Sequence, residues 1–123
     1  MNEYQKSNFS FTFPFDSRLS ENKRLIFCRG RFHSQKAYRD LKSQMVIVAA
    51  FSLARAKAKF KKSRVNVHIF VYRPDMRSDC QNYIKPIFDA VSEAIGIDDR
   101  WFGGSLDWSI NKANPRFSIE VVQ

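Results

Sequence analysis

Hydrophobic and polar residues alternate in two segments of the chain. In residues 8–15 every second position is a phenylalanine, and Pro14 near the end of this run is typical of a strand end or a sheet edge. In residues 65–72 the aliphatic residues Val65, Val67, Ile69 and Val71 alternate with Asn66, His68, Phe70 and Tyr72. Because successive side chains of a strand point to opposite faces, each segment is predicted to be a half-buried β-strand.

Two other segments carry apolar residues at spacings of three and four, which predicts helices with one buried face. The first is expected to begin at Ser34 as N-cap and to reach about residue 60, with the helical-face positions Tyr38, Leu41, Met45, Val48, Ser52, Leu53, Ala56 and Phe60. The second is expected from about Cys80 to Ile95, with Pro86 near its start and Gly96 at its end.

The remaining segments predict loops and hairpins. Residues 16–31 are polar and aperiodic apart from a patch at 25–27, so we expect a loop with a short hairpin. Near the end, residues 108–110 and 117–122 flank the turn signal Asn114-Pro115, which predicts a terminal hairpin. The order of strands and helices favours a single α+β domain over residues 1–123.

The formal net charge of +9 and the pI near 9.9 favour a polyanionic partner. Residues 55–64 hold six of the basic residues and no acid, at the end of the first predicted helix. A solvated helix end and a phosphate-contacting end both explain this cluster. Cys28 and Cys80 form no metal-binding pattern and are expected to be reduced thiols. The polar start and the short apolar stretch at 45–51 predict a cytoplasmic protein without a membrane span.

The acidic residues are concentrated in one region of the sequence. Six of twelve lie between Arg73 and Arg100, at Asp75, Asp79, Asp89, Glu93, Asp98 and Asp99. A metal site in a phosphate-binding groove would explain this, because a cation must separate carboxylates from phosphate. A solvated helix face also explains Asp89 and Glu93, and helix capping explains Asp79. The helix between Asp79 and Asp99 is roughly 22 Å long. These two acids can meet only if the chain folds back after Gly96 or if two subunits share a site.

The sequence in this region resembles the RusA-type Holliday junction resolvases, whose core motif reads D-x-D-N-x-x-K, then an apolar helix with a further Asp, then D-D. The matching residues here are Asp79-Cys80-Gln81-Asn82, Lys85, Asp89 and Asp98-Asp99. Upstream, residues 8–15 are similar to the opening strand of the family. Residues 22–24 and 29–33 resemble its basic loop, and Tyr38-Arg39 matches a pair in its first helix. The resemblance covers most of the chain and implies a mixed sheet packed against two main helices.

The resemblance also implies roles for individual residues. Asp79 and Asp99 would be catalytic metal ligands for Mg²⁺, with Asp98 as an adjacent acid, and Lys85 would stabilise charge on the scissile phosphate. The second aspartate of the motif is Gln81 here, which offers a carbonyl oxygen but no charge. Asn82 matches the asparagine of the motif. DNA phosphates would be held by the basic residues Arg24, Arg29, Arg31, Lys59, Lys61 and Lys62.

The function that the resemblance implies is magnesium-dependent hydrolysis of DNA four-way junctions in recombination and repair. Two symmetric nicks imply a homodimer. Two alternatives stay open at this point. Loss of the charge at Gln81 favours a junction or duplex DNA-binding protein with weak or no activity. The aromatic faces of the strands favour a module that binds single strands or RNA.

Overall fold

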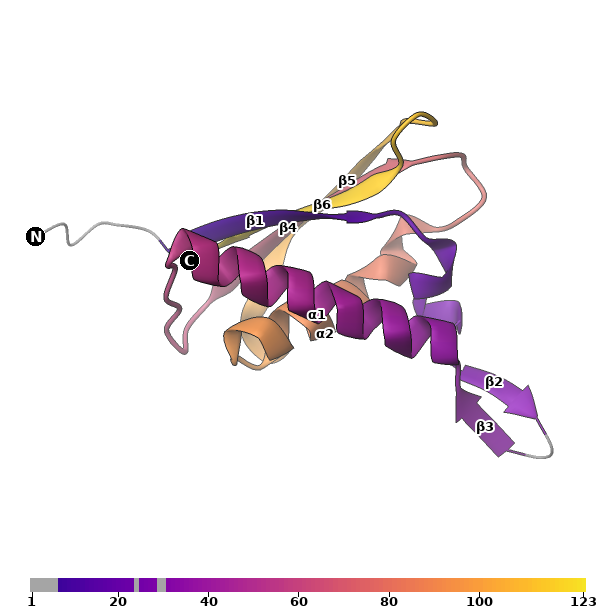
Figure 1. Ribbon diagram of the computed structural model, residues 1–123, viewed down its shortest axis with the longest axis horizontal. Helices are drawn as coiled ribbons and strands as arrows, with labels where there is room; N and C mark the ends of the chain where they lie inside the picture. The colour runs from indigo at the N-terminus through magenta and orange to yellow at the C-terminus, as the bar shows by residue number, and fades with distance from the viewer. Residues whose placement is uncertain (1–6, 24, 29–30) are drawn as a thin grey trace, which may run out of the picture.

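Four strands form the main sheet of the computed structural model, which describes residues 7–23, 25–28 and 31–123. The strands are β1 (Asn8–Pro14), β4 (Val65–Arg73), β5 (Phe102–Ile110) and β6 (Arg116–Val122), in the spatial order β1-β6-β4-β5. Two main helices, α1 (Lys36–Ala56) and α2 (Ile84–Ile95), cover one face of this sheet (Figure 1). The predicted α+β fold with a mixed sheet and two main helices is confirmed.

The core lies between the helices and the inward face of the sheet. The alternation expected for β1 and β4 is confirmed, because Phe9, Phe11 and Phe13 are buried and every second residue of β4 from Val65 is buried. Strand β6 adds Phe117, Ile119 and Val121 to the same layer. Burial of about ten aromatic and aliphatic side chains from three strands stabilises the fold, at roughly 1.5–3 kcal/mol each.

The predicted terminal hairpin is wrong, because β5 and β6 are not neighbours. Strand β4 lies between them, antiparallel to β6 and parallel to β5. A parallel neighbour requires a crossover, and α2 provides it. Strand β5 also begins earlier than expected, at Phe102. Its Gly104 has φ of 137°, and a Cβ there would lie 1.9 Å from the carbonyl oxygen of Val67, so only glycine allows this close pairing.

Helix α1 begins and ends at residues other than those predicted. Ser34 is the last residue of a strand, and the N-cap is Gln35, which makes no capping bond with its side chain. The helix ends at Ala56, where Lys57 adopts the left-handed conformation with φ of 54°. Residues 57–64 therefore form a loop before β4. Phe60 lies in this loop and packs edge-on against Phe9.

The second helical segment has two parts. A 3₁₀ turn, η3 (Cys80–Tyr83), precedes α2, and Pro86 is buried in the first turn of α2, where it removes no needed donor. Gly96 ends α2 in the left-handed conformation, as predicted. Cys80 is a free, buried thiol.

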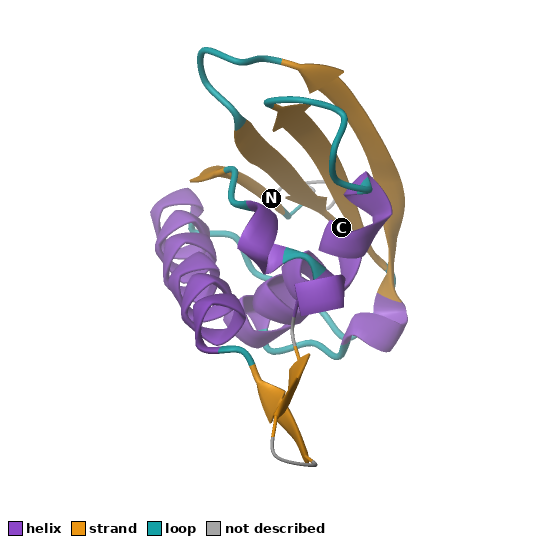
Figure 2. Cartoon of the chain, turned by 90° about the vertical axis from the view of Figure 1, so that its right-hand side faces the viewer, coloured by secondary structure: helices purple, strands orange, loops and turns teal. Residues whose placement is uncertain are grey.

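Residues 16–34 contain two 3₁₀ turns, η1 (Ser17–Leu19) and η2 (Glu21–Lys23), and the expected short hairpin. The hairpin consists of β2 (Leu25–Cys28) and β3 (Arg31–Ser34) and projects beyond the first turn of α1 (Figure 2). In the described part of the chain, no helix has the length and apolar character needed to cross a membrane.

Candidate active site

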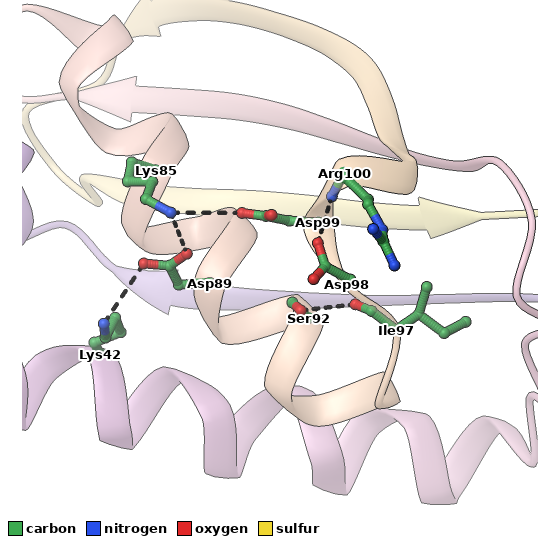
Figure 3. Close-up of polar contacts among 8 residues, drawn as sticks. All are labelled: Lys42, Lys85, Asp89, Ser92, Ile97, Asp98, Asp99 and Arg100. Carbon is green, nitrogen blue, oxygen red and sulfur yellow. Dashed lines mark hydrogen bonds and ion pairs between the residues drawn. The ribbon is translucent and has the colours of Figure 1, made fainter.

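A chain of alternating charges connects α1, α2 and the turn before β5 (Figure 3). The Lys85 ammonium donates a hydrogen bond to Asp89 Oδ1 at 2.9 Å and lies 3.6 Å from Asp99 Oδ2. The second oxygen of Asp89 lies 3.6 Å from the Nζ of Lys42 on α1. We call Lys42, Asp89, Lys85 and Asp99 the ion-pair chain. It brings together two predicted catalytic residues, Lys85 and Asp99.

The turn after α2 brings Asp99 back alongside the helix. Gly96 donates its N–H to the Ser92 carbonyl at 2.9 Å, and the Ser92 hydroxyl donates to the Ile97 carbonyl at 2.7 Å. Buried Ile97 fixes the reversal in the core. The next turn, η4 (Asp99–Trp101), begins with Asp98 as its N-cap, because Asp98 accepts the Arg100 N–H at 2.9 Å. The chain thus folds back after Gly96 and brings Asp99 to Lys85, whereas a meeting of Asp79 with Asp99 stays a prediction.

The electrostatic environment of Lys85 favours its charged form. The hydrogen bond to Asp89 raises the pKa of the Lys85 ammonium above its ordinary value, and the charges of Asp89 and Asp99 add to this effect. Lys85 is therefore a cation at neutral pH. A cation at this position can stabilise negative charge on a phosphate.

Asp79 is held by the loop that follows β4. Arg73, at the end of β4, is almost fully buried and donates to the carbonyls of Asp75 at 2.8 Å and of Ser78, which bends the loop before Asp79. Tyr83 anchors the following turn, packing against Phe15 and Phe117 in the core. Arg73 on one side and Tyr83 on the other therefore fix Asp79 between β4 and α2.

The carboxylate of Asp79 caps η3, as the capping interpretation predicted. Its Oδ1 accepts the Gln81 N–H at 3.0 Å. Asp79 and Asn82 line a hollow of about 500 Å³, whose other lining residues are Phe15, Ser17, Ser20, Asn22, Pro74, Asp75, Arg77 and Ser78. Gln81 is exposed, next to this hollow in sequence. Lys85 and Asp99 do not line the hollow.

Of the acids expected to bind metal, Asp79 lines the hollow, and Asp99, preceded by Asp98, ends the ion-pair chain. Within residues 7–23, 25–28 and 31–123, no three or more His, Cys, Asp or Glu side chains form a group that could hold a metal ion. The donor types still suit magnesium, which takes hard oxygens and is usually held by one or two carboxylates plus phosphate and water. The assignment of Asp79, Gln81, Asp98 and Asp99 to a metal stays a prediction.

Four of the six basic residues predicted to contact DNA are described by the structure, and they lie toward the two ends of α1. Arg24 and Arg29 lie outside the described residues, and Arg31 begins β3 in the projecting hairpin (Figure 1). At the other end, Lys59, Lys61 and Lys62 are exposed in the loop after α1. Gln123 anchors this loop, because its side-chain amide accepts from the Lys61 N–H and donates to the Lys61 carbonyl, both at 2.7 Å. Lys59, Lys61 and Lys62 thus lie in a fixed loop, while Arg55 of the same cluster lies in the last turn of α1.

Sequence reasoning missed the part that Lys42 and Asp89 play. Asp89 was matched to the family motif, with a solvated helix face as the alternative, but its side chain is only 26% exposed and contacts two lysines. The spacing of four between Lys85 and Asp89 could have indicated their ion pair. Lys42 carried no such signal, because its contact with Asp89 depends on how α1 packs against α2. Glu93 is exposed, as the solvated-face interpretation expects.

Comparison with known proteins identifies a matching family and similar solved structures, among them two distant ones. The family described as "Endodeoxyribonuclease RusA" matches residues 14–122. No curated protein sequence matches. A 2C-methyl-D-erythritol-2,4-cyclodiphosphate synthase structure is 9% identical with a TM-score of 0.41, covering 96% of this chain and 97% of the other. The Plasmodium vivax enzyme of that name is 10% identical with a TM-score of 0.38, covering 96% and 94%. Structural likeness at this level carries no functional conclusion.

Proposed function

Because this chain belongs to the RusA family of endodeoxyribonucleases, we propose that it is a magnesium-dependent enzyme that resolves four-way DNA junctions by paired hydrolysis of phosphodiester bonds. RusA-family proteins are junction-resolving nucleases that bind DNA junctions and generally depend on a divalent metal. The observation that carries the proposal for this chain is the contact of Lys85 with Asp99, two motif residues brought within 3.6 Å from opposite ends of α2. Such a DNA-processing role belongs in the cytoplasm and serves recombination and repair.

The side chains of this site divide the work of hydrolysis. Asp79 and Asp99 would hold magnesium, with Asp98 beside them and the Gln81 carbonyl oxygen as a neutral ligand. Bound magnesium supplies a polarised phosphoryl group and a water of lowered pKa. Lys85, protonated and held by Asp89, would place its positive charge against the phosphate oxygens as negative charge grows on them. Whether Asp79 acts with Asp99 of its own subunit or of a partner depends on the dimer.

Gln81 supports a second candidate, a junction-binding protein of the same fold with weak or no cleavage. The glutamine removes one negative charge from the proposed metal site. A site with fewer charged ligands binds magnesium more weakly. The single-strand or RNA-binding alternative has less support. Tyr72, on the open face of the sheet, already carries the Arg116 guanidinium 3.9 Å from its ring centre, which covers the surface that a base would stack on.

The experiment that tests the proposal is a nicking assay on a mobile four-way junction. We expect paired nicks in the junction when magnesium is present. Duplex DNA of the same sequence should not be nicked. Binding of the junction without nicks at any magnesium concentration would favour the non-catalytic candidate. Equal binding of junction, duplex and single strand would contradict both candidates.

We also propose a homodimer, because a four-way junction offers two equivalent cut sites related by a twofold axis. Light scattering at micromolar protein concentration should give twice the mass of the 14.4 kDa chain. A monomeric mass, both alone and with junction DNA, would contradict the dimer.

DNA binding is expected to depend strongly on salt and little on sequence. If about six phosphates are neutralised, log K should fall with log salt with a slope of about −5. Replacing Lys59, Lys61 and Lys62 by alanine should reduce this slope, because all three side chains are exposed on one anchored loop. Lys36→Ala is the matched control, an exposed lysine already paired with Asp40 at 2.6 Å. An unchanged slope in the triple variant would show that these lysines are solvated and do not contact DNA phosphate.

A further inference from the structure

Asp89 lies between two lysines that come from different helices. Lys85, one turn earlier on α2, bonds to one carboxylate oxygen, and Lys42 on α1 lies 3.6 Å from the other (Figure 3). The three side chains are between 26% and 45% exposed, so water only partly screens their charges. Lys42 also lies 5.5 Å from the ring centre of Tyr38, a buried residue one turn earlier on α1. The Lys42 ammonium is thus held by both the Asp89 carboxylate and the Tyr38 ring.

This arrangement matters because, without its carboxylate partners, the Lys85 ammonium would have no defined position. A lysine side chain has four rotatable bonds, and its ammonium bonds in no fixed direction. Its two partners differ, because Asp99 is a proposed metal ligand and Asp89 is not. If Asp99 held a metal, Asp89 would be the one of these two partners left to hold Lys85. The direction of Lys85 then depends on how firmly Asp89 is held.

We propose that Lys42 is a positioning residue for the phosphodiester hydrolysis: acting through Asp89, it holds the Lys85 ammonium toward the scissile phosphate. The assignment rests on the proposed function for the role of Lys85. Lys42 has no place in the family motif that matches this chain, and it reaches the site only through the packing of α1 on α2. Its charge balances one side of the Asp89 carboxylate and leaves the other oxygen directed at Lys85.

Two other roles for Lys42 make different predictions. A lysine that contacts DNA phosphate directly would contribute to affinity and to the salt slope, but not to the rate of a bound junction. A lysine that only joins α1 to α2 would contribute to the free energy of unfolding. Its replacement would then lower stability and leave the cleavage rate of the folded enzyme unchanged. A positioning residue acts on the rate at saturation, and only while Asp89 is present.

The test compares Lys42→Met, Lys42→Arg and Asp89→Asn with Lys36→Met as control. Lys36→Met removes a lysine ion-paired on the same helix but remote from the ion-pair chain. With saturating junction and magnesium, we expect Lys42→Met to lower the single-turnover cleavage rate about tenfold, because a small misplacement of a reacting group is costly. The junction Kd should change less than about twofold, since one lost phosphate contact would change it more. Lys42→Arg should retain most of the rate.

The double variant decides whether Lys42 acts through Asp89. In the Asp89→Asn background, Lys42→Met should lower the rate no further, because the intermediate residue is already lost. Equal losses in both backgrounds would contradict the proposal. So would an unchanged rate with a weaker Kd and a smaller salt slope, which would make Lys42 a phosphate contact.

A second measurement does not need cleavage. In ¹H–¹⁵N spectra of the lysine ammonium groups at low temperature, Lys85 should give a sharp signal in the parent and in Lys36→Met, and a broadened one in Lys42→Met. A Lys85 signal that only Asp89→Asn changes would overturn the role of Lys42. If the parent cleaves no junction but the Lys42→Met spectrum broadens, the proposed function has failed while the positioning contact stands.

Discussion

Asp79→Asn is expected to abolish cleavage of the four-way junction while leaving junction binding intact or tighter. A metal ligand at the reacting centre contributes several kcal/mol of charge stabilisation, so its loss should lower the single-turnover rate by about a thousandfold or more. Binding should not weaken, because the substitution removes a negative charge from a surface that receives phosphate. The measurement is the rate with saturating magnesium, beside the junction Kd without magnesium.

In this structure the substitution tests the charge of the Asp79 carboxylate separately from its capping role. Asp79 also caps η3 through its bond to the Gln81 N–H, and asparagine caps helices about as well as aspartate. The turn should therefore persist in Asp79→Asn, and a lost rate would reflect the missing carboxylate. A thermal unfolding curve checks that the fold is retained.

Asp75→Asn is the matched control, because Asp75 lines the same hollow and makes the same local bond. Its Oδ1 accepts the N–H two residues ahead, that of Arg77, at 3.0 Å. Asp75 has no place in the family motif, so we expect its loss to change the rate no more than about threefold, as for surface substitutions outside a site. Equal losses in Asp75→Asn and Asp79→Asn would contradict a specific role for Asp79.

The local patterns of the sequence predicted much of the secondary structure, because each pattern depends on the burial of one strand or helix. The alternating phenylalanines of β1 and the alternating aliphatics of β4 indicated their buried faces directly. Strand β5 was only partly found, since it contains two glycines and is largely exposed, so burial imposes no clear period on it. Its pairing with β4 in place of β6 depends on the path of α2, which no local pattern records.

In the candidate site, too, local features were predictable from the sequence and contacts between elements were not. The residues that match the motif were identified from their order, and the spacing within one helix explains the pair Lys85 and Asp89. The contact of Asp89 with Lys42 joins residues 47 positions apart in the sequence and depends on the packing of two helices. The approach of Asp99 to Lys85 depends on the Gly96 reversal and on Ile97 entering the core. Sequence reasoning allowed this reversal but did not predict that it brings Asp99 to Lys85.

Gln81→Asp is expected to raise the cleavage rate and to lower the magnesium concentration at half-maximal rate by about tenfold, because ligand charge sets the affinity for hard cations. Gln81 is exposed within η3 and bonds to Asp79 only through its backbone N–H, so the fold should accept the change. The parent should be a slow enzyme, since two carboxylates can still hold one ion once DNA phosphate completes its shell.

Gln81→Asn is the matched control, because asparagine has the shape of aspartate without its charge. A magnesium titration of nicking by the parent and the two variants separates charge from size, and only Gln81→Asp should shift the midpoint. If the parent nicks at no magnesium concentration and Gln81→Asp restores cleavage, the chain is a junction-binding protein that lost its activity with this charge. If neither protein cleaves, Gln81 does not belong to the metal site.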